Sequence, residues 1–112
     1  MNTITELHTF TKKAEKLLGE AARAQLFTYL AQRPEAGALI EGTGGVRKLR
    51  WAREGKGKSG GVRVIYYFHS ETLPLLMIDM YAKNEKENIS KADKNTLATL
   101  VAEYVKSFRR KS

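Results

Sequence analysis

Seven cations lie between Gly42 and Ser70, a stretch with a single acid, Glu54. They are Arg47, Lys48, Arg50, Arg53, Lys56, Lys58 and Arg63. This stretch carries most of the formal net charge of +8, and the rest of the chain is close to neutral. A charge excess concentrated in one segment of a small protein is typical of a surface that binds a polyanion such as RNA.

Strand alternation predicts which of these cations share a surface. In the expected strand Val46–Arg53, Lys48 and Arg50 lie on one face, and Leu49 and Trp51 lie on the other. If the Leu and Trp face is buried, the two cations point toward solvent or substrate. The remaining cations of this strand are Arg47 and Arg53. They lie near the strand ends, where a long side chain can reach around the end of the strand to the other face.

Arg63 lies near the start of the next expected strand, on the same face as Ile65 and Tyr67. This position predicts partial burial of its side chain against them. A partly buried arginine either forms a structural salt bridge or serves a binding role. For a salt bridge, the candidate partners are Asp79 and Glu54.

The glycine-rich segment 55–61 lies within the basic block. Its spacing fits G-x-G-x-x-G and its GKS resembles the end of a Walker A loop, but both nucleotide sites need a helix to begin there. The following run VRVIYYFH is β-branched and aromatic and predicts a strand instead. A kinase-type glycine loop is also excluded, because the chain has no H-R-D or D-F-G element. We interpret the segment as a hairpin connection whose Lys56 and Lys58 can grip a phosphate backbone.

The third expected strand ends in an aromatic residue followed by two more cations. They are Tyr81, Lys83 and Lys86. An aromatic ring beside cations suits base stacking on a nucleic acid. The structural alternative is that this tyrosine belongs to the core.

The chain contains no cysteine and only two histidines, His8 and His69, far apart in the sequence. Thiolate catalysis and a cysteine zinc site are therefore excluded, and the sequence predicts neither a metal nor a cofactor. A pair of histidines acting as acid and base on RNA stays an open alternative. Otherwise the chemistry must come from Lys, Arg, Tyr, Asp or Glu.

The periodicities predict an α+β fold with a small antiparallel sheet. The expected strands are 3–8, 46–53, 62–69 and 73–82, the last three forming a meander. The expected helices are 10–18, 20–33 and one that follows Ser90. Ser90 and Asp93 resemble a capping box for this last helix. Its apolar stripe indicates core or partner contact and consists of Leu97, Leu100, Val101, Tyr104, Val105 and Phe108.

The length of 112 residues predicts a single domain spanning 1–112. No apolar run approaches the roughly 20 residues that span a bilayer, so we expect no membrane contact. The amino terminus MNTITELHTFTKKAEK lacks the apolar core and cleavage site of a secretion signal. We therefore expect the protein to act in the cytoplasm.

Three stretches of the sequence together resemble the HigB branch of the RelE/ParE toxin superfamily. They are GTGGVRKLRW from Gly42, GKGKSGGVRVIYYF from Gly55 and YAKNEK from Tyr81. The likeness covers most of the chain, from about Glu20 onward. It implies a RelE-like fold, with two amino-terminal helices and a carboxy-terminal helix on a small antiparallel sheet. It also implies the toxin half of a type II toxin–antitoxin system.

Toxins of this kind cleave messenger RNA in the ribosomal A site without a metal or cofactor. The implied partners are a cognate antitoxin, typically a helix-turn-helix protein from the adjacent gene, and the ribosome with its messenger. Operator DNA is implied only through the antitoxin complex. By this likeness Arg63 matches the family's strand arginine, and Lys48 and Arg50 match its basic strand. The chain departs from the RelE pattern in having no tyrosine within 86–94.

Cleavage by the ribose 2′-hydroxyl needs a base, an acid and positive charge on the crowded phosphorane. We assign Arg63 to that charge, Lys48 or Lys58 to proton transfer, and Tyr81 to base stacking or orientation. The candidate catalytic residues are Lys48, Lys58, Arg63, Tyr81 and Lys83. The candidate RNA-binding residues are Arg47, Arg50, Arg53, Lys56 and Lys86.

Two other functions stay open on the sequence. A non-catalytic RNA-binding or ribosome-binding module would explain the basic block without any cleavage chemistry. A ParE-like toxin directed at gyrase would share the fold but would not need this concentration of Lys and Arg.

Overall fold

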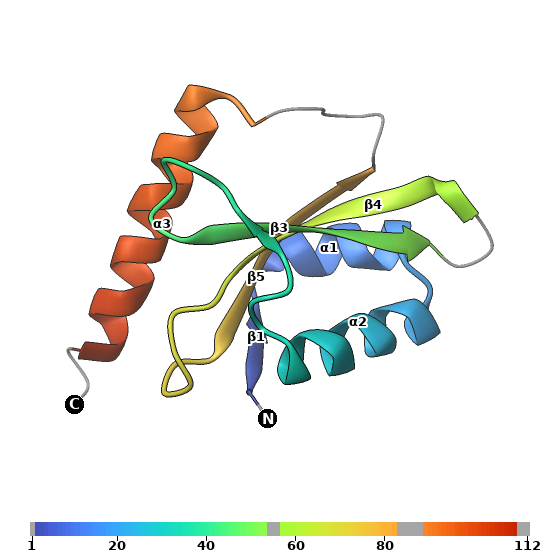
Figure 1. The fold of residues 1–112 in the computed structure, drawn as a ribbon, viewed down its shortest axis with the longest axis horizontal. Helices are drawn as coiled ribbons and strands as arrows, with labels where there is room; N and C mark the ends of the chain where they lie inside the picture. Colours follow the sequence, from blue (N-terminus) through green and yellow to red (C-terminus); the bar gives the residue numbers. More distant parts are fainter. Residues whose placement is uncertain (1, 54–56, 83–88, 110–112) are drawn as a thin grey trace.

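The computed structural model describes residues 2–53, 57–82 and 89–109. Within them three helices pack on a five-stranded mixed sheet (Figure 1). The helices are α1 (His8–Leu17), α2 (Glu20–Gln32) and α3 (Lys91–Arg109). The strands are β1 (Ile4–Glu6), β2 (Ala38–Leu39), β3 (Val46–Arg53), β4 (Gly57–Tyr67) and β5 (Leu75–Ala82). The predicted α+β class is confirmed.

The strands lie in the order β1-β5-β4-β3-β2. β3, β4 and β5 form the predicted antiparallel meander. Two edge pairings differ from expectation. β1 pairs parallel with β5, with Ile4 opposite Leu75, so one edge of the sheet is parallel. The short β2 was not expected; it pairs antiparallel with β3, with Ala38 opposite Lys48.

Most element boundaries agree with the sequence pattern, and β4 shows the largest shift. It begins at Gly57 rather than at Val62, because pairing with β3 continues out to Gly57 opposite Arg53. Part of the glycine-rich segment is therefore strand. The cap of α3 is confirmed, since the backbone N–H of Asp93 donates to Ser90 Oγ at 3.1 Å.

One face of the sheet, which we call the hairpin face, is covered by α1 and α2. Leu49 and Trp51 of β3 pack here against the buried core, as the alternation predicts. The fully buried residues of this core include Phe10, Leu26, Leu30, Val62, Val64, Tyr66 and Met80. Burial of Leu49 and Trp51 directs their neighbours Lys48 and Arg50 to the opposite face.

That opposite face, the α3 face, is only partly covered. The apolar stripe of α3 packs against Val46, Ile65, Tyr67 and Tyr81. In Figure 1, α3 crosses one end of the sheet, while the end of β3 and the start of β4 extend away from it. The stripe is thus core contact, and no described helix covers the far part of this face. No helix in the described ranges is both long and apolar enough to cross a membrane.

The hydroxyl of Tyr66 ties the sheet to the connection between α2 and β2. It accepts a hydrogen bond from the N–H of Gly37 at 2.8 Å and donates one to the carbonyl of Pro34 at 2.9 Å. Gly37 must be glycine here, because a β-carbon would lie 2.8 Å from a ring carbon of Tyr66. Burial raises the pKa of Tyr66, which keeps this hydroxyl protonated.

The first prediction is that Tyr66→Phe lowers the free energy of unfolding by about 1–3 kcal/mol, because the buried N–H of Gly37 loses its acceptor. Urea unfolding followed by circular dichroism measures this change. Tyr67→Phe is the matched control, since Tyr67 lies on the same strand and its hydroxyl makes no hydrogen bond within the described residues. Equal losses from both variants would contradict the prediction.

The second prediction concerns alkaline pH. Burial raises the pKa of Tyr66, Tyr67 and Tyr104 above the ordinary value of 10.0. Below pH 10 these groups are protonated in both the folded and unfolded states; above it the unfolded chain ionises first, so their contribution to stability falls as pH rises. Urea unfolding between about pH 8 and about pH 11 should show a shallower decline for Tyr66→Phe than for the wild type. Identical declines would refute the assignment.

Candidate functional site

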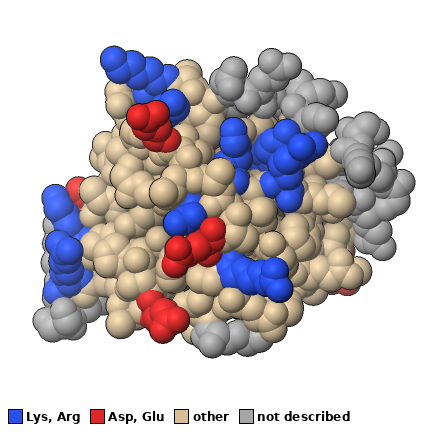
Figure 2. Space-filling view, in the orientation of Figure 1, with Lys and Arg blue, Asp and Glu red and all other residues tan. Residues whose placement is uncertain are grey.

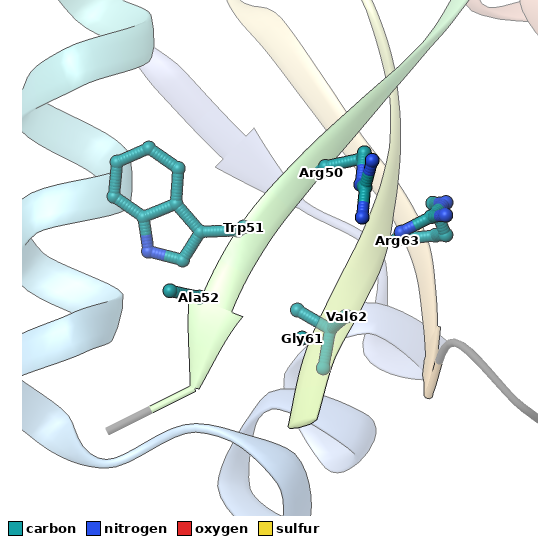
Figure 3. A pocket seen from close by; sticks show the side chains of 6 residues that line it. All are labelled: Arg50, Trp51, Ala52, Gly61, Val62 and Arg63. Carbon is teal, nitrogen blue, oxygen red and sulfur yellow. The ribbon is translucent and has the colours of Figure 1, made fainter. Parts of the chain in front are cut away.

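Two arginines face each other directly across β3 and β4. Arg50 is paired with Arg63, and Arg63 is paired in turn with Tyr81 of β5, so the three form one row on the α3 face. The neighbouring row contains Lys48, Ile65 and Asp79. Figure 3 shows both guanidinium groups on the same side of the hairpin, with Trp51 directed to the other side. The predicted facing of Lys48, Arg50 and Arg63 is therefore confirmed.

This arginine pair is not neutralised by any described residue. Neither Arg50 nor Arg63 forms an ion pair or a side-chain hydrogen bond within the described ranges. The expected salt bridge from Arg63 to Asp79 does not form, because Asp79 Oδ1 lies 2.8 Å from Lys13 Nζ. The other expected partner, Glu54, lies outside the described residues. Like charges directly opposite each other destabilise a strand pair, so a bound anion between these two would relieve the repulsion.

A shallow hollow of about 320 Å³ adjoins the two arginines (Figure 3). Its lining consists of Arg50, Trp51, Ala52, Gly61, Val62 and Arg63. Ala52 and Gly61 carry little or no side chain, so the hollow is not filled at their positions. Both arginines line the same hollow, so an anion that enters it can approach both cations.

Trp51 fixes the strand that carries Arg50. Its indole N–H donates to the carbonyl of Ala22 in α2 at 3.2 Å, and its ring centroid lies 5.3 Å from that of Tyr29. The strand is therefore anchored to α2 one residue away from Arg50. This anchor positions the arginine backbone on a rigid element, as precise recognition requires.

Lys94 is a candidate site residue that sequence reasoning missed. It lies in the first turn of α3 and lines a second hollow, of about 220 Å³, together with Lys48, Ile40 and Ile89. No local pattern indicates this, because the helix and β3 are brought together only by the packing of α3. We call Lys94, Lys48, Arg50 and Arg63 the basic track.

Three of the four cations of the basic track lie on one face of β3 and β4. Figure 2 shows Lys and Arg side chains gathered over β3 and β4 on the viewed face, with no acidic side chain between them. Neither Lys48 nor Lys94 forms an ion pair with another described residue. An array of uncompensated cations on two adjacent strands and a helix end is suited to a phosphate backbone.

Arg47 lies apart from the basic track. It points to the hairpin face, where its guanidinium donates to the carbonyls of Glu35 at 3.1 Å and Gly37 at 2.8 Å. Its Nη2 also lies 3.9 Å from a carboxylate oxygen of Glu35. The side chain is thus occupied in holding the α2–β2 connection, and the structure does not bring it together with the other candidates.

Tyr81 lies in the arginine row, but its side chain is only 5% exposed. It packs in the core beneath α3 with Ile65 and Ile78. A ring in this position cannot offer a face to a nucleic acid base, so the expected stacking role finds no support. The sequence indicated the correct face, but it did not show how far α3 extends over it.

The remaining candidates lie outside the described residues or at the ends of β3 and β4. Lys56, Lys83 and Lys86 lie outside the described residues. The backbones of Arg53 and Lys58 lie at the ends of β3 and β4 that meet, next to the two arginines.

The two histidines lie on different elements. His8 begins α1, whereas His69 follows β4 and its Nδ1 lies 3.2 Å from Ser70 Oγ. No contact between them is found in the described part of the chain, so an acid–base pair of histidines finds no geometric support. Within that part, no three His, Asp or Glu side chains gather in a metal-binding cluster.

The comparison with known families agrees with this fold. Residues 8–111 match the family described as the RelE toxin of the RelE/RelB toxin–antitoxin system. The match spans all three helices and β2 to β5. It includes the whole basic track and the arginine row. The chain therefore belongs to the RelE toxin family.

Proposed function

We propose that this chain is a HigB-like toxin that stops translation by cutting messenger RNA on the ribosome. Membership of a toxin family supports the toxin role. One observation carries the choice of RNA as target: Arg50 and Arg63 oppose each other beside a hollow, with no ion pair to another described residue. Arginine keeps its charge at physiological pH, and its fork of donors matches the oxygens of a phosphate.

The proposed reaction is attack of the ribose 2′-hydroxyl on the adjacent phosphorus. The 2′-oxygen bonds to phosphorus and gives its proton to a base, while the bond to the 5′-oxygen breaks and that oxygen takes a proton from an acid. The products are a 2′,3′-cyclic phosphate and a 5′-hydroxyl. Arg63 and Arg50 stabilise the charge of the phosphorane. Lys48 or Lys58 transfers the protons, so no step needs a metal ion.

The ribosome has a defined part in this proposal. The buried Tyr81 cannot stack on the substrate, and we therefore assign it to supporting the strand beside Arg63. A site without an aromatic platform orients free RNA weakly, and correct orientation is a large part of catalysis. The ribosome supplies that orientation by holding the messenger in the A site. Lys83, Lys86, Lys56 and Arg53 are proposed as further backbone contacts.

The proposed antitoxin is encoded by the adjacent gene and carries a helix-turn-helix domain. It neutralises the toxin by placing acidic side chains on the basic track. This mode is favoured because the apolar stripe of α3 is already occupied in the core. The toxin acts in the cytoplasm and is brought to operator DNA only through the antitoxin.

The third prediction is that expression of this chain alone arrests growth and leaves messenger RNA cut within codons on translating ribosomes. Primer extension and ribosome profiling measure the cuts. Co-expression of the neighbouring gene should restore growth. Growth arrest with intact messenger and damaged DNA would favour a gyrase-directed toxin. Translation arrest without any cut would favour a non-catalytic ribosome-binding module.

The fourth prediction is that Arg63→Ala slows ribosomal cleavage by at least about 10²-fold, because it removes charge from the reacting phosphate. The fold should persist, since Arg63 makes no ion pair with a described residue. Lys48→Ala and Lys58→Ala should have partial effects, because neighbouring cations compensate. Single-turnover cleavage on programmed ribosomes measures each rate.

Arg33→Ala is the matched control for Arg63→Ala. Arg33 is an exposed arginine at the end of α2, with its guanidinium 5.6 Å from the ring centroid of Tyr29 and away from the basic track. We expect wild-type cleavage from this variant. If Arg63→Ala unfolds the protein, or if both variants lose activity equally, Arg63 is not a specific contributor to the reaction.

A further inference from the structure

Two lysines line the same hollow between β3 and α3. Lys48 comes from the middle of β3 and Lys94 from the first turn of α3, and both line the same space of about 220 Å³. Its other lining residues are Ile40 and Ile89. Apolar walls weaken the screening of charge by water, so an anion between the two ammonium groups is held more strongly than on an open surface.

The position of Lys94 is supported by the loop before β3. A β-carbon at Gly42 would lie 3.7 Å from Cδ of Lys94, so this loop runs beside the aliphatic stem of the lysine. Gly42 has a φ of 83°, a conformation that glycine adopts without strain. The loop therefore passes near the stem of Lys94, whose side chain lines the hollow together with Lys48.

The hollow continues the line of the arginine pair. Lys48 and Arg50 are two residues apart on one strand face, a separation of about 7 Å along the strand. This spacing is comparable to that between successive phosphates of a single RNA strand. Arg63 lies directly across from Arg50. An RNA strand with one phosphate at the arginine pair would therefore bring its neighbouring phosphate to the two lysines.

We infer that the hollow lined by Lys48 and Lys94 is a second phosphate subsite, which binds the RNA phosphate next to the one held by Arg50 and Arg63. This inference rests on the proposed function for its choice of RNA. It assigns Lys94 to substrate positioning, and it gives Lys48 a binding contact beside any role in proton transfer. Two anchored phosphates fix the direction of the RNA strand across the site, which one phosphate cannot do.

The fifth prediction tests this subsite with a short single-stranded RNA that carries a 2′-O-methyl group at every sugar, so that it cannot be cut. One phosphate at a time is replaced by a neutral methylphosphonate, and binding is measured by fluorescence anisotropy. For the wild-type protein, neutralising the subsite phosphate weakens binding. Lys94→Ala binds the unmodified RNA more weakly and responds less than the wild type to neutralisation at that one position, because only Lys48 remains to contact the phosphate. Its slope of log K against log salt is smaller by about 0.7, the contribution of one single-strand phosphate.

Lys91→Ala is the matched control, because Lys91 begins the same helix and is exposed but does not line the hollow. This variant should match the wild type at every position, and Lys94→Arg should keep the response. If Lys94→Ala retains wild-type affinity and the full response, the subsite is overturned. Ribosomal cleavage is scored separately. If cleavage fails while the phosphate response persists, the proposed function is overturned and the subsite stands.

Discussion

The register between β3 and β4 is the constraint on which the site depends. Side chains alternate along a strand, so a shift by one residue would turn Leu49 and Trp51 to solvent and bury the cations under α1 and α2. The indole hydrogen bond from Trp51 to α2 helps to hold the register, as does burial of Val62 and Val64 opposite β3. The position of the arginine pair therefore follows from packing on the hairpin face.

The extent of α3 decides which part of the other face can bind. The helix packs over Val46, Tyr67 and Tyr81, whereas in the row of Tyr81 Arg63 is half-buried and Arg50 is exposed. Residues of similar type thus acquire different roles. The guanidinium of Arg47 donates hydrogen bonds to backbone carbonyls, whereas Arg63 has no such partner among the described residues. Among the described residues, the basic cations that lack an ion-pair partner are therefore fewer than the composition suggests.

Local pattern predicted the elements and faces that depend on short-range rules. The alternation in β3 correctly placed Lys48 and Arg50 opposite Leu49 and Trp51, because burial of one face is a local property of a strand. The parallel pairing of β1 with β5 was not predictable in this way, since it joins residues far apart along the chain, such as Ile4 and Leu75. Burial of Tyr81 and the approach of Lys94 to Lys48 depend on where α3 packs. The residue spacing around Tyr81 or around Lys94 does not indicate where α3 packs on the sheet.

The opposed arginines weaken the pairing of β3 with β4, and their presence in such a small sheet calls for a physical reason. A like-charged pair directly opposite across two strands is destabilising, and neither arginine forms an ion pair with a described acid. The cost is tolerable because the hairpin face supplies most of the core. The same repulsion becomes binding energy when a phosphate lies between the two guanidinium groups. A salt bridge to Asp79 would have stabilised the free protein but would have competed with that phosphate, so pairing Asp79 with Lys13 leaves the anion position open.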